Sequence, residues 1–302
     1  MTESRVAKHM PDDRTKARGM IDNKSGLRRP DARRKTCFGI AIASVALLLL
    51  VCSNGCRRAL TNEQSEAKEI NVAAAANLSE AFNELGKQFT ARTGIRVVYS
   101  FGATADLTKQ VENGAPFDLF AAADTEHVEQ LDRQRLIVPG TATLYARGRL
   151  IVWTPAGSSI KLDRIEDLRR AEVERISIAR PDAAPYGRAA VEALRALNLW
   201  NDIEPKVIYG QNVSQAKQYV ATGNADAALL PRSLVSEGDG QAIAVDERLH
   251  QPIDQSLAVI HASTKQEAAR LFSQYILSPE GQSLLQRYGY EKAVASDKSS
   301  DK

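Results

Sequence analysis

Four short turns carry the residues best suited to bind a small anion. They contain Asn77 in "VAAAANLSEAF", Thr104 in "SFGATADL", Tyr186 in "RPDAAPYGRAA" and Val213 in "YGQNVSQA". Each residue stands where a helix is expected to begin, and the first N–H groups of a helix have no intrahelical partner and carry partial positive charge. The small residues around them allow a ligand to approach the backbone. Together the four turns predict one anion pocket.

Helix capping is the alternative interpretation of the same residues. Asn is among the strongest N-cap residues, and Thr104 could cap the helix that follows it. For any single turn, capping is the more economical explanation. Two such turns in each half of the chain favour a shared pocket, because isolated caps need not recur in this pattern.

The familiar catalytic and metal-binding motifs do not occur in the sequence. There is no Walker loop, no GxSxG elbow and no HExxH pair. The four histidines are scattered, at His9, His127, His250 and His261. Asp118 and Asp124 flank the segment "LFAAA" and could form an acid/base pair, but Asp124 is better interpreted as the cap of a helix beginning at Thr125. We expect neither an enzyme nor a cofactor.

The elements that position these turns alternate between strand-like and helix-like patterns. Apolar strand segments are expected at 69–76, 95–101, 117–123, 149–155, 175–181, 206–210, 226–231 and 256–262. Helical spacing is expected at 78–94, 104–114, 125–136, 186–200, 212–224, 265–278 and 279–289. This alternation predicts an α/β fold with parallel sheets and right-handed crossovers, in which ligands bind beyond the carboxyl ends of the strands.

Composition and charge narrow the class of protein. The chain has 302 residues, 43% of them hydrophobic and 25% charged, which fits one large globular domain or two lobes. The formal net charge of +3 is unevenly placed: residues 1–56 carry 11 Lys and Arg against 5 Asp and Glu, and the remainder 29 against 32. The body is therefore mildly acidic, which argues against a nucleic-acid-binding surface.

Residues 1–56 are interpreted as an export leader. Arginines and a lysine precede the 15-residue apolar run "FGIAIASVALLLLVC", which is shorter than the ~20 residues of a membrane span and typical of a signal peptide. The following "CSNGC" resembles a bacterial lipoprotein cleavage site, with Cys56 as the lipidated residue. Lipidation at Cys52, for which the preceding Val51 is bulky, an uncleaved anchor and ordinary signal cleavage are the alternatives. Residues 57–68 are expected to be a polar tether, and 295–302 a disordered tail.

Four stretches resemble the periplasmic molybdate-binding proteins of ABC importers. They are "VAAAANLSEAF", "FGATADLTKQVENGAPFDLFAAAD", "ARPDAAPYGRAAVEAL" and "SPEGQSLLQRYGY", and the resemblance covers roughly residues 70–290. It implies a two-lobed, type II-like periplasmic binding protein fold, with a mostly parallel sheet flanked by helices in each lobe. Lobe 1 would comprise 69–148 plus 252–294 and lobe 2 149–251, with hinge crossings near 147–149 and 250–255.

The resemblance also implies how the anion is held. The family uses hydroxyls and backbone N–H groups, without a Lys or Arg salt bridge, so molybdenum would be present only as the bound oxyanion. Asn77 stands where many members have Ser, Thr104 keeps a hydroxyl, and Tyr186 and Val213 stand at backbone-donor positions. Some members add a Tyr hydroxyl where this chain has Pro231; the Tyr186 hydroxyl could replace it.

The function implied is capture of molybdate, and of tungstate, for delivery to the permease and ATPase of an ABC importer. The protein would be a periplasmic monomer, anchored to a membrane by lipid, with no nucleic-acid partner. The alternatives are a receptor for another oxyanion or a small organic anion, such as sulfate or phosphate, an enzyme on the same bilobal fold, and the sensing domain of a regulator.

Overall fold

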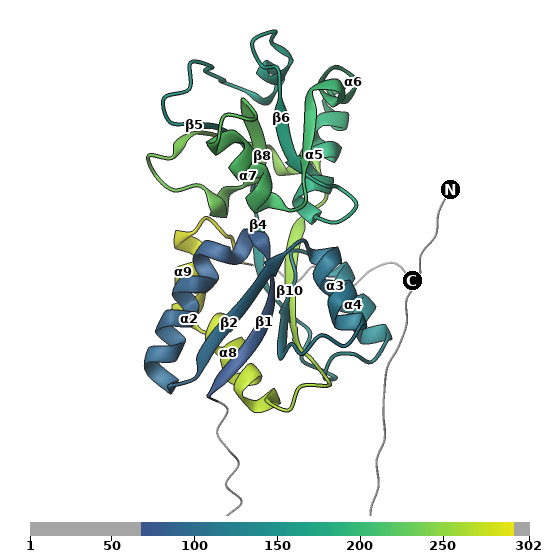
Figure 1. The fold of residues 1–302 in the computed structure, drawn as a ribbon, viewed down its shortest axis with the longest axis vertical. Helices are drawn as coiled ribbons and strands as arrows, with labels where there is room; N and C mark the ends of the chain where they lie inside the picture. The colour runs from purple at the N-terminus through teal and green to yellow at the C-terminus, as the bar shows by residue number, and fades with distance from the viewer. Residues whose placement is uncertain (1–67, 293–302) are drawn as a thin grey trace, which may run out of the picture. The chain divides into compact units, whose positions relative to one another are not determined.

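A computed structural model describes residues 68–292 of the chain (Figure 1). The leader with the proposed lipid site at Cys56, nearly all of the tether, and the tail from 295 lie outside the described residues. Within 68–292, no helix is both long and apolar enough to cross a membrane.

The described chain forms two five-stranded sheets. The first has the strand order β2-β1-β3-β10-β4 and the second β7-β6-β8-β5-β9. The strands of the first sheet are β1 (Glu69–Ala75), β2 (Arg96–Gly102), β3 (Leu119–Ala121), β4 (Thr143–Gly148) and β10 (Ile253–Val259). Those of the second are β5 (Leu150–Pro155), β6 (Ile176–Ala179), β7 (Val207–Gly210), β8 (Ala227–Pro231) and β9 (Gly240–Ala244). Each sheet with its helices is called a lobe below, first and second in this order.

One strand in each sheet runs against the other four. In the first lobe β10 pairs antiparallel with both β3 and β4, and in the second lobe β5 pairs antiparallel with both β8 and β9. The remaining pairs, β1–β2, β1–β3, β6–β7 and β6–β8, are parallel. The reason is connectivity: parallel neighbours need a crossover segment, whereas β5 and β10 are entered from the other sheet. The expected mostly parallel sheets are therefore mixed.

Helices cover both faces of the first sheet. The helices α2 (Ser79–Thr93), α8 (Gln266–Leu277) and α9 (Pro279–Arg287) lie on one face, and α3 (Thr104–Glu112) and α4 (Glu126–Arg133) on the other (Figure 1). The alternation of side chains along β1 serves both layers: Val72 and Ala74 join the cluster with Phe82 and Phe272, and Ala73 joins the cluster with Leu107. A strand buried on both faces needs the unbroken apolar run seen at residues 72–76.

The second lobe repeats this arrangement with α5 (Pro185–Ala196), α6 (Trp200–Ile203) and α7 (Val213–Ala221). Along β5, Ile151 and Trp153 pack with residues of α7, while Leu150 and Val152 belong to the cluster that includes residues of α5. The chain passes from the first sheet to the second between β4 and β5, and returns between β9 and β10. At the return, Arg147 of β4 and Asp254 of β10 form a two-bond ion pair, with Nε to Oδ1 at 2.6 Å and Nη2 to Oδ2 at 2.9 Å.

The expected succession of strands and helices is confirmed, with the short helix α6 and the strands β4 and β9 added. Both strands are weak as sequence patterns. β4 reads "TLYARG", which mixes polar and small residues, and β9 reads "GQAIA", which begins with a glycine and has no fully buried position. β9 is an edge strand, and the pairing that forms it comes from β5 rather than from its own apolar character.

Candidate anion-binding site

A small cavity lies between the two lobes, at the ends of the strands. It encloses about 190 Å³ of space between atoms, a figure that includes the part open to solvent. Twelve residues line it, from both lobes: Ala75, Ala76, Asn77, Gly102, Ala103, Thr104, Ala123, Ala184, Pro185, Tyr186, Asn212 and Val213. A cavity this small excludes a large organic ligand.

Four helical segments begin at this cavity. They are α3, α5, α7 and the short 3-10 turn η1 (Ala76–Leu78), which continues directly into α2. The N-cap residues are Ala75 for η1, Ala103 for α3 and Ala184 for α5, and none of the three provides a side-chain cap. Alanine is a poor cap, so it leaves the first N–H groups of these segments without a protein acceptor from the N-cap side chain.

All four residues predicted from the sequence line the cavity. Thr104 is the first residue of α3, Tyr186 the second of α5 and Val213 the first of α7. Asn77 lies in the middle of η1. The capping interpretation of Asn77 and Thr104 is wrong, because the cap positions belong to the alanines one or two residues earlier.

The cavity lining is neutral. None of the twelve residues carries a charge at neutral pH. The guanidinium groups of Arg180 and Arg188 reach toward the first lobe, but they pair there with carboxylates: Arg180 with Asp106, and Arg188 with Asp124 and Glu126. Hydrogen-bond donors and helix N-termini are therefore what the lining itself offers an anion.

The side-chain amide of Asn77 is engaged inside the protein. Its Nδ2 donates to Oε1 of Gln255 at 2.9 Å and to the Tyr290 hydroxyl at 3.0 Å. The side chain is 1% exposed. Because both amide hydrogens have acceptors, the group of Asn77 that remains for a ligand is its backbone N–H.

The hydroxyl of Thr104 is oriented by the backbone of the first lobe. It accepts a hydrogen bond from the N–H of Ala123 at 3.2 Å. A hydroxyl has one hydrogen and two lone pairs, so accepting here leaves the hydrogen to be donated elsewhere. Thr104 and Ala123 both line the cavity, which makes the Thr104 O–H a donor beside the helix N-termini.

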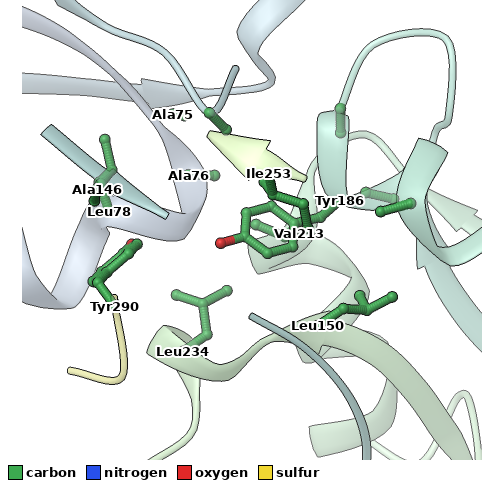
Figure 2. Close-up of a cluster of buried hydrophobic side chains, with 14 of the residues drawn as sticks. Ala75, Ala76, Leu78, Ala146, Leu150, Tyr186, Val213, Leu234, Ile253 and Tyr290 are labelled. Atoms are coloured by element: carbon green, nitrogen blue, oxygen red, sulfur yellow. The ribbon is translucent and has the colours of Figure 1, made fainter. Parts of the chain in front are cut away.

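Tyr186 is buried at the junction of the lobes. Figure 2 shows its ring within the buried cluster that also contains Ala76, Leu150 and Ile253. Its hydroxyl accepts from Nε2 of Gln255 at 3.1 Å, and burial raises its pKa well above the ordinary value, so it stays protonated. A methyl group at Gly148 would overlap this hydroxyl, which explains why glycine ends β4.

Direct hydrogen bonds join the lobes around the cavity. The N–H of Ala105 in α3 donates to the carbonyl of Ala183 at 3.1 Å. The hydroxyl of Ser233, in the 3-10 turn η4 (Arg232–Leu234), donates to the carbonyl of Asn77 at 2.9 Å. The structure is therefore that of lobes in contact across the site.

Gln255, Tyr290, Tyr145 and Ser233 are polar residues of the site region that the sequence reasoning missed. All four are at least nine-tenths buried. One signal was available: Gln255 lies within the strand "IDQSLAV", in which every residue but Asp254 is buried, and a buried amide requires partners. The partners themselves are distant in sequence, from Asn77 to Tyr290, and could not be identified without the fold.

Asp118 and Asp124 have separate partners. Asp118 accepts from the N–H of Asn71 and the hydroxyl of Ser263, at 2.7 Å each. Asp124 accepts from the N–H of His127 at 3.2 Å, as expected for a carboxylate at the start of α4. Among residues 68–292 no group of three or more His, Cys, Asp or Glu side chains is placed to hold a metal ion.

Sequence comparison identifies relatives among the solute-binding proteins of bacteria. Residues 70–291 match the family of bacterial extracellular solute-binding proteins. The molybdate-binding protein ModA of Rhodobacter capsulatus is 32% identical over 225 residues, or 74% of this chain and 88% of that protein. ModA of Azotobacter vinelandii is 34% identical over 232 residues, or 75% of this chain and 91% of that protein.

Solved structures agree with the sequence relatives. The periplasmic molybdate-binding protein of Azotobacter vinelandii superimposes with a TM-score of 0.70 at 25% identity, covering 74% of this chain and all of that chain. The sulfate-binding protein SubI of Mycobacterium tuberculosis has a TM-score of 0.66 at 17% identity, covering 76% of this chain and 88% of that chain, a likeness of fold alone. The expected two-lobed α/β periplasmic binding protein fold is confirmed.

The buried tyrosines predict a loss of stability in alkali. Burial raises the pKa of Tyr145, Tyr186 and Tyr290 above the ordinary value near 10. Their contribution to the free energy of unfolding is therefore complete below pH ~10. Above that pH the unfolded chain releases protons that the folded chain keeps, so the free energy of unfolding falls by up to ~1.4 kcal/mol per pH unit for each tyrosine. Urea unfolding at pH 8, 9, 10 and 11 measures this. A free energy of unfolding that stays level from pH 9 to 11 would contradict it.

Proposed function

The chain belongs to the bacterial extracellular solute-binding proteins, and from that premise we propose that it captures molybdate and delivers it to an ABC importer. The observation that carries the proposal is the convergence of four helix N-termini on a small, neutral cavity. Such an arrangement binds an anion through backbone N–H groups and aligned peptide dipoles. The two ModA relatives, which align with about three quarters of this chain, are molybdate-binding proteins.

Neutral donors select for the protonation state of the ligand. Molybdate is a dianion near neutral pH, so it accepts hydrogen bonds and donates none. A protonated anion such as hydrogen phosphate would place its O–H against a donor, which leaves buried groups unpaired. A lining that offers N–H and O–H groups therefore favours a fully deprotonated tetrahedral anion. Tungstate has the same charge and nearly the same size, and we propose that it binds as well.

Four positions would hold the anion. Asn77, Tyr186 and Val213 contribute backbone N–H groups from the first turns of η1, α5 and α7, and Thr104 contributes its hydroxyl. The N–H of Gln215 in α7 is capped by the side chain of Asn212 at 3.0 Å, so the earlier N–H groups of that helix are the ones left for a ligand.

The cellular part of the proposal rests on the family and on the leader. An extracellular solute-binding protein works outside the cytoplasm, and we propose a periplasmic monomer held to a membrane through a lipid on Cys56. Its partners would be the permease and ATPase of the importer. We also propose that the anion is bound unchanged, since the cavity lining of the described chain contains no carboxylate, imidazole or thiol for acid–base or nucleophilic chemistry.

Calorimetric titration of the purified protein with molybdate, tungstate, sulfate and phosphate tests the proposed ligand. We expect molybdate and tungstate to bind at least 100-fold more tightly than phosphate, corresponding to ~2.7 kcal/mol or more. Sulfate shares the charge and shape of molybdate, so its weaker binding would depend on cavity size. Tight binding of sulfate with no binding of molybdate would overturn the proposal.

Replacing Thr104 by Val tests the hydroxyl donor. A hydrogen bond to a charged group contributes ~1.5–3 kcal/mol, so we expect the Kd for molybdate to rise by about 10- to 100-fold. Thr108→Val is the matched control, because Thr108 is equally buried one turn later in α3 and donates to the carbonyl of Thr104. Equal affinities in the two variants would remove Thr104 from the site.

Replacing Tyr186 by Phe tests whether its hydroxyl compensates for Pro231. The structure places Pro231 at the end of β8, and proline has neither a hydroxyl nor an N–H to offer. If the Tyr186 hydroxyl donates to the anion, Tyr186→Phe weakens molybdate binding by at least tenfold in calorimetry. Tyr209→Phe, at an exposed position of the same lobe, serves as the control. Unchanged affinity in Tyr186→Phe would refute the compensation.

A further inference from the structure

Asn77 is the centre of a buried hydrogen-bond network. Its carbonyl accepts from the Tyr290 hydroxyl at 2.7 Å and from the Ser233 hydroxyl at 2.9 Å. Its side-chain amide donates to Gln255 and, at 3.0 Å, to Tyr290. The side chain and the carbonyl of one residue thus make four hydrogen bonds to three partners.

Gln255 extends the network toward the second lobe. Its Oε1 accepts from Asn77 and from the Tyr145 hydroxyl, at 2.9 and 3.0 Å, while its Nε2 donates to Tyr186. Gln255 is fully buried, and the pairing of β10 with β4 shifts register directly after it. The strand irregularity coincides with the point where this amide reaches partners in both lobes.

The network crosses between the lobes at two points. Asn77, Tyr145, Gln255 and Tyr290 belong to the first lobe. Ser233 and Tyr186 belong to the second. The bonds from Ser233 to Asn77 and from Gln255 to Tyr186 are therefore the two bonds of this network that join the lobes.

We propose that Asn77 is a positioning residue, which locks η1 onto Gln255 and Ser233 when the lobes close and so holds the N–H groups of η1 toward the anion. The inference rests on the proposed function for its ligand. In this proposal the side chain of Asn77 binds Gln255 and Tyr290 and does not contact the anion. It also makes Ser233, immediately beyond Pro231, a residue that links closure to binding.

Two features of the network fit a lock. Both amide hydrogens of Asn77 and the hydroxyl hydrogens of Ser233, Tyr145 and Tyr290 have acceptors inside the protein, so these groups do not compete for the anion. A buried network paired in this way favours one arrangement. All its side chains are neutral, and burial keeps the three tyrosines protonated by raising the pKa of each. The lock therefore holds across the neutral pH range.

Ser233→Ala tests the cross-lobe bond. The bond forms only after the lobes meet, so its loss should leave the association rate for molybdate unchanged and raise the dissociation rate about fivefold, the equivalent of one neutral hydrogen bond. Stopped-flow fluorescence with molybdate measures both rates. Ser236→Ala, an exposed position three residues later, is the matched control and should change neither rate. A Ser233→Ala dissociation rate equal to wild type would overturn the proposal.

A double-mutant cycle separates positioning from direct contact. Asn77→Ala and Gln255→Leu each remove the bond between these side chains, and each also removes a bond to a tyrosine. The loss of molybdate affinity in the double variant should therefore be smaller than the sum of the two single losses. Fully additive losses would mean that the bond between Asn77 and Gln255 does not act on the anion site, which contradicts the proposal. We expect Asn77→Ser to bind molybdate as weakly as Asn77→Ala, because the shorter serine side chain cannot reach both Gln255 and Tyr290.

A readout without anion separates this inference from the proposed function. Small-angle scattering of the anion-free protein should show Ser233→Ala shifted toward open lobes relative to wild type and Ser236→Ala. If wild-type protein fails to bind molybdate, the proposed function fails, while this shift still supports the lock. If scattering shows no shift and the rates are unchanged, the lock fails whatever the ligand.

Discussion

An anion that entered this neutral cavity would have to be stabilised without a counter-charge, and the architecture meets that constraint. The cavity lining supplies no Lys or Arg, so the stabilisation has to come from N–H groups and helix dipoles. Backbone donors can converge from four directions only if four helical segments begin at one point. Two α/β sheets with their strand ends facing each other provide those starts, and the alanine N-caps keep the donors free of side chains that would occupy them.

Much of this arrangement could be predicted from the sequence. Each of Thr104, Tyr186 and Val213 follows an expected strand, and each is the first or second residue of an amphipathic helix in the structure. What the sequence could not show is where a side chain points. Asn77 is of a residue type that often caps helices, and it lines the cavity, yet its amide donates to Gln255. Gln255 is 178 positions away in sequence and is brought next to Asn77 by the placement of β10 within the first sheet. Local propensity contains no information on such pairs.

The polar groups near the cavity divide into two sets with different tasks. Backbone N–H groups at helix starts and the Thr104 hydroxyl are oriented by neighbours that leave a hydrogen to donate. The amide of Asn77 and the hydroxyls of Ser233 and Tyr290 donate within the protein, and these residues are buried at the junction of the lobes.

The reversed strand β10 has a consequence for how the chain folds. It lies between β3 and β4 in the first sheet, so β4 has no strand partner until residues 253–259 have been synthesised. The helices α8 and α9, which complete one face of that sheet, come later still. The first lobe therefore cannot finish folding before nearly the whole described chain exists, and its slowest step should be the long-range docking of β10 rather than the formation of any local element. The lobe that begins the described chain is the last to be completed.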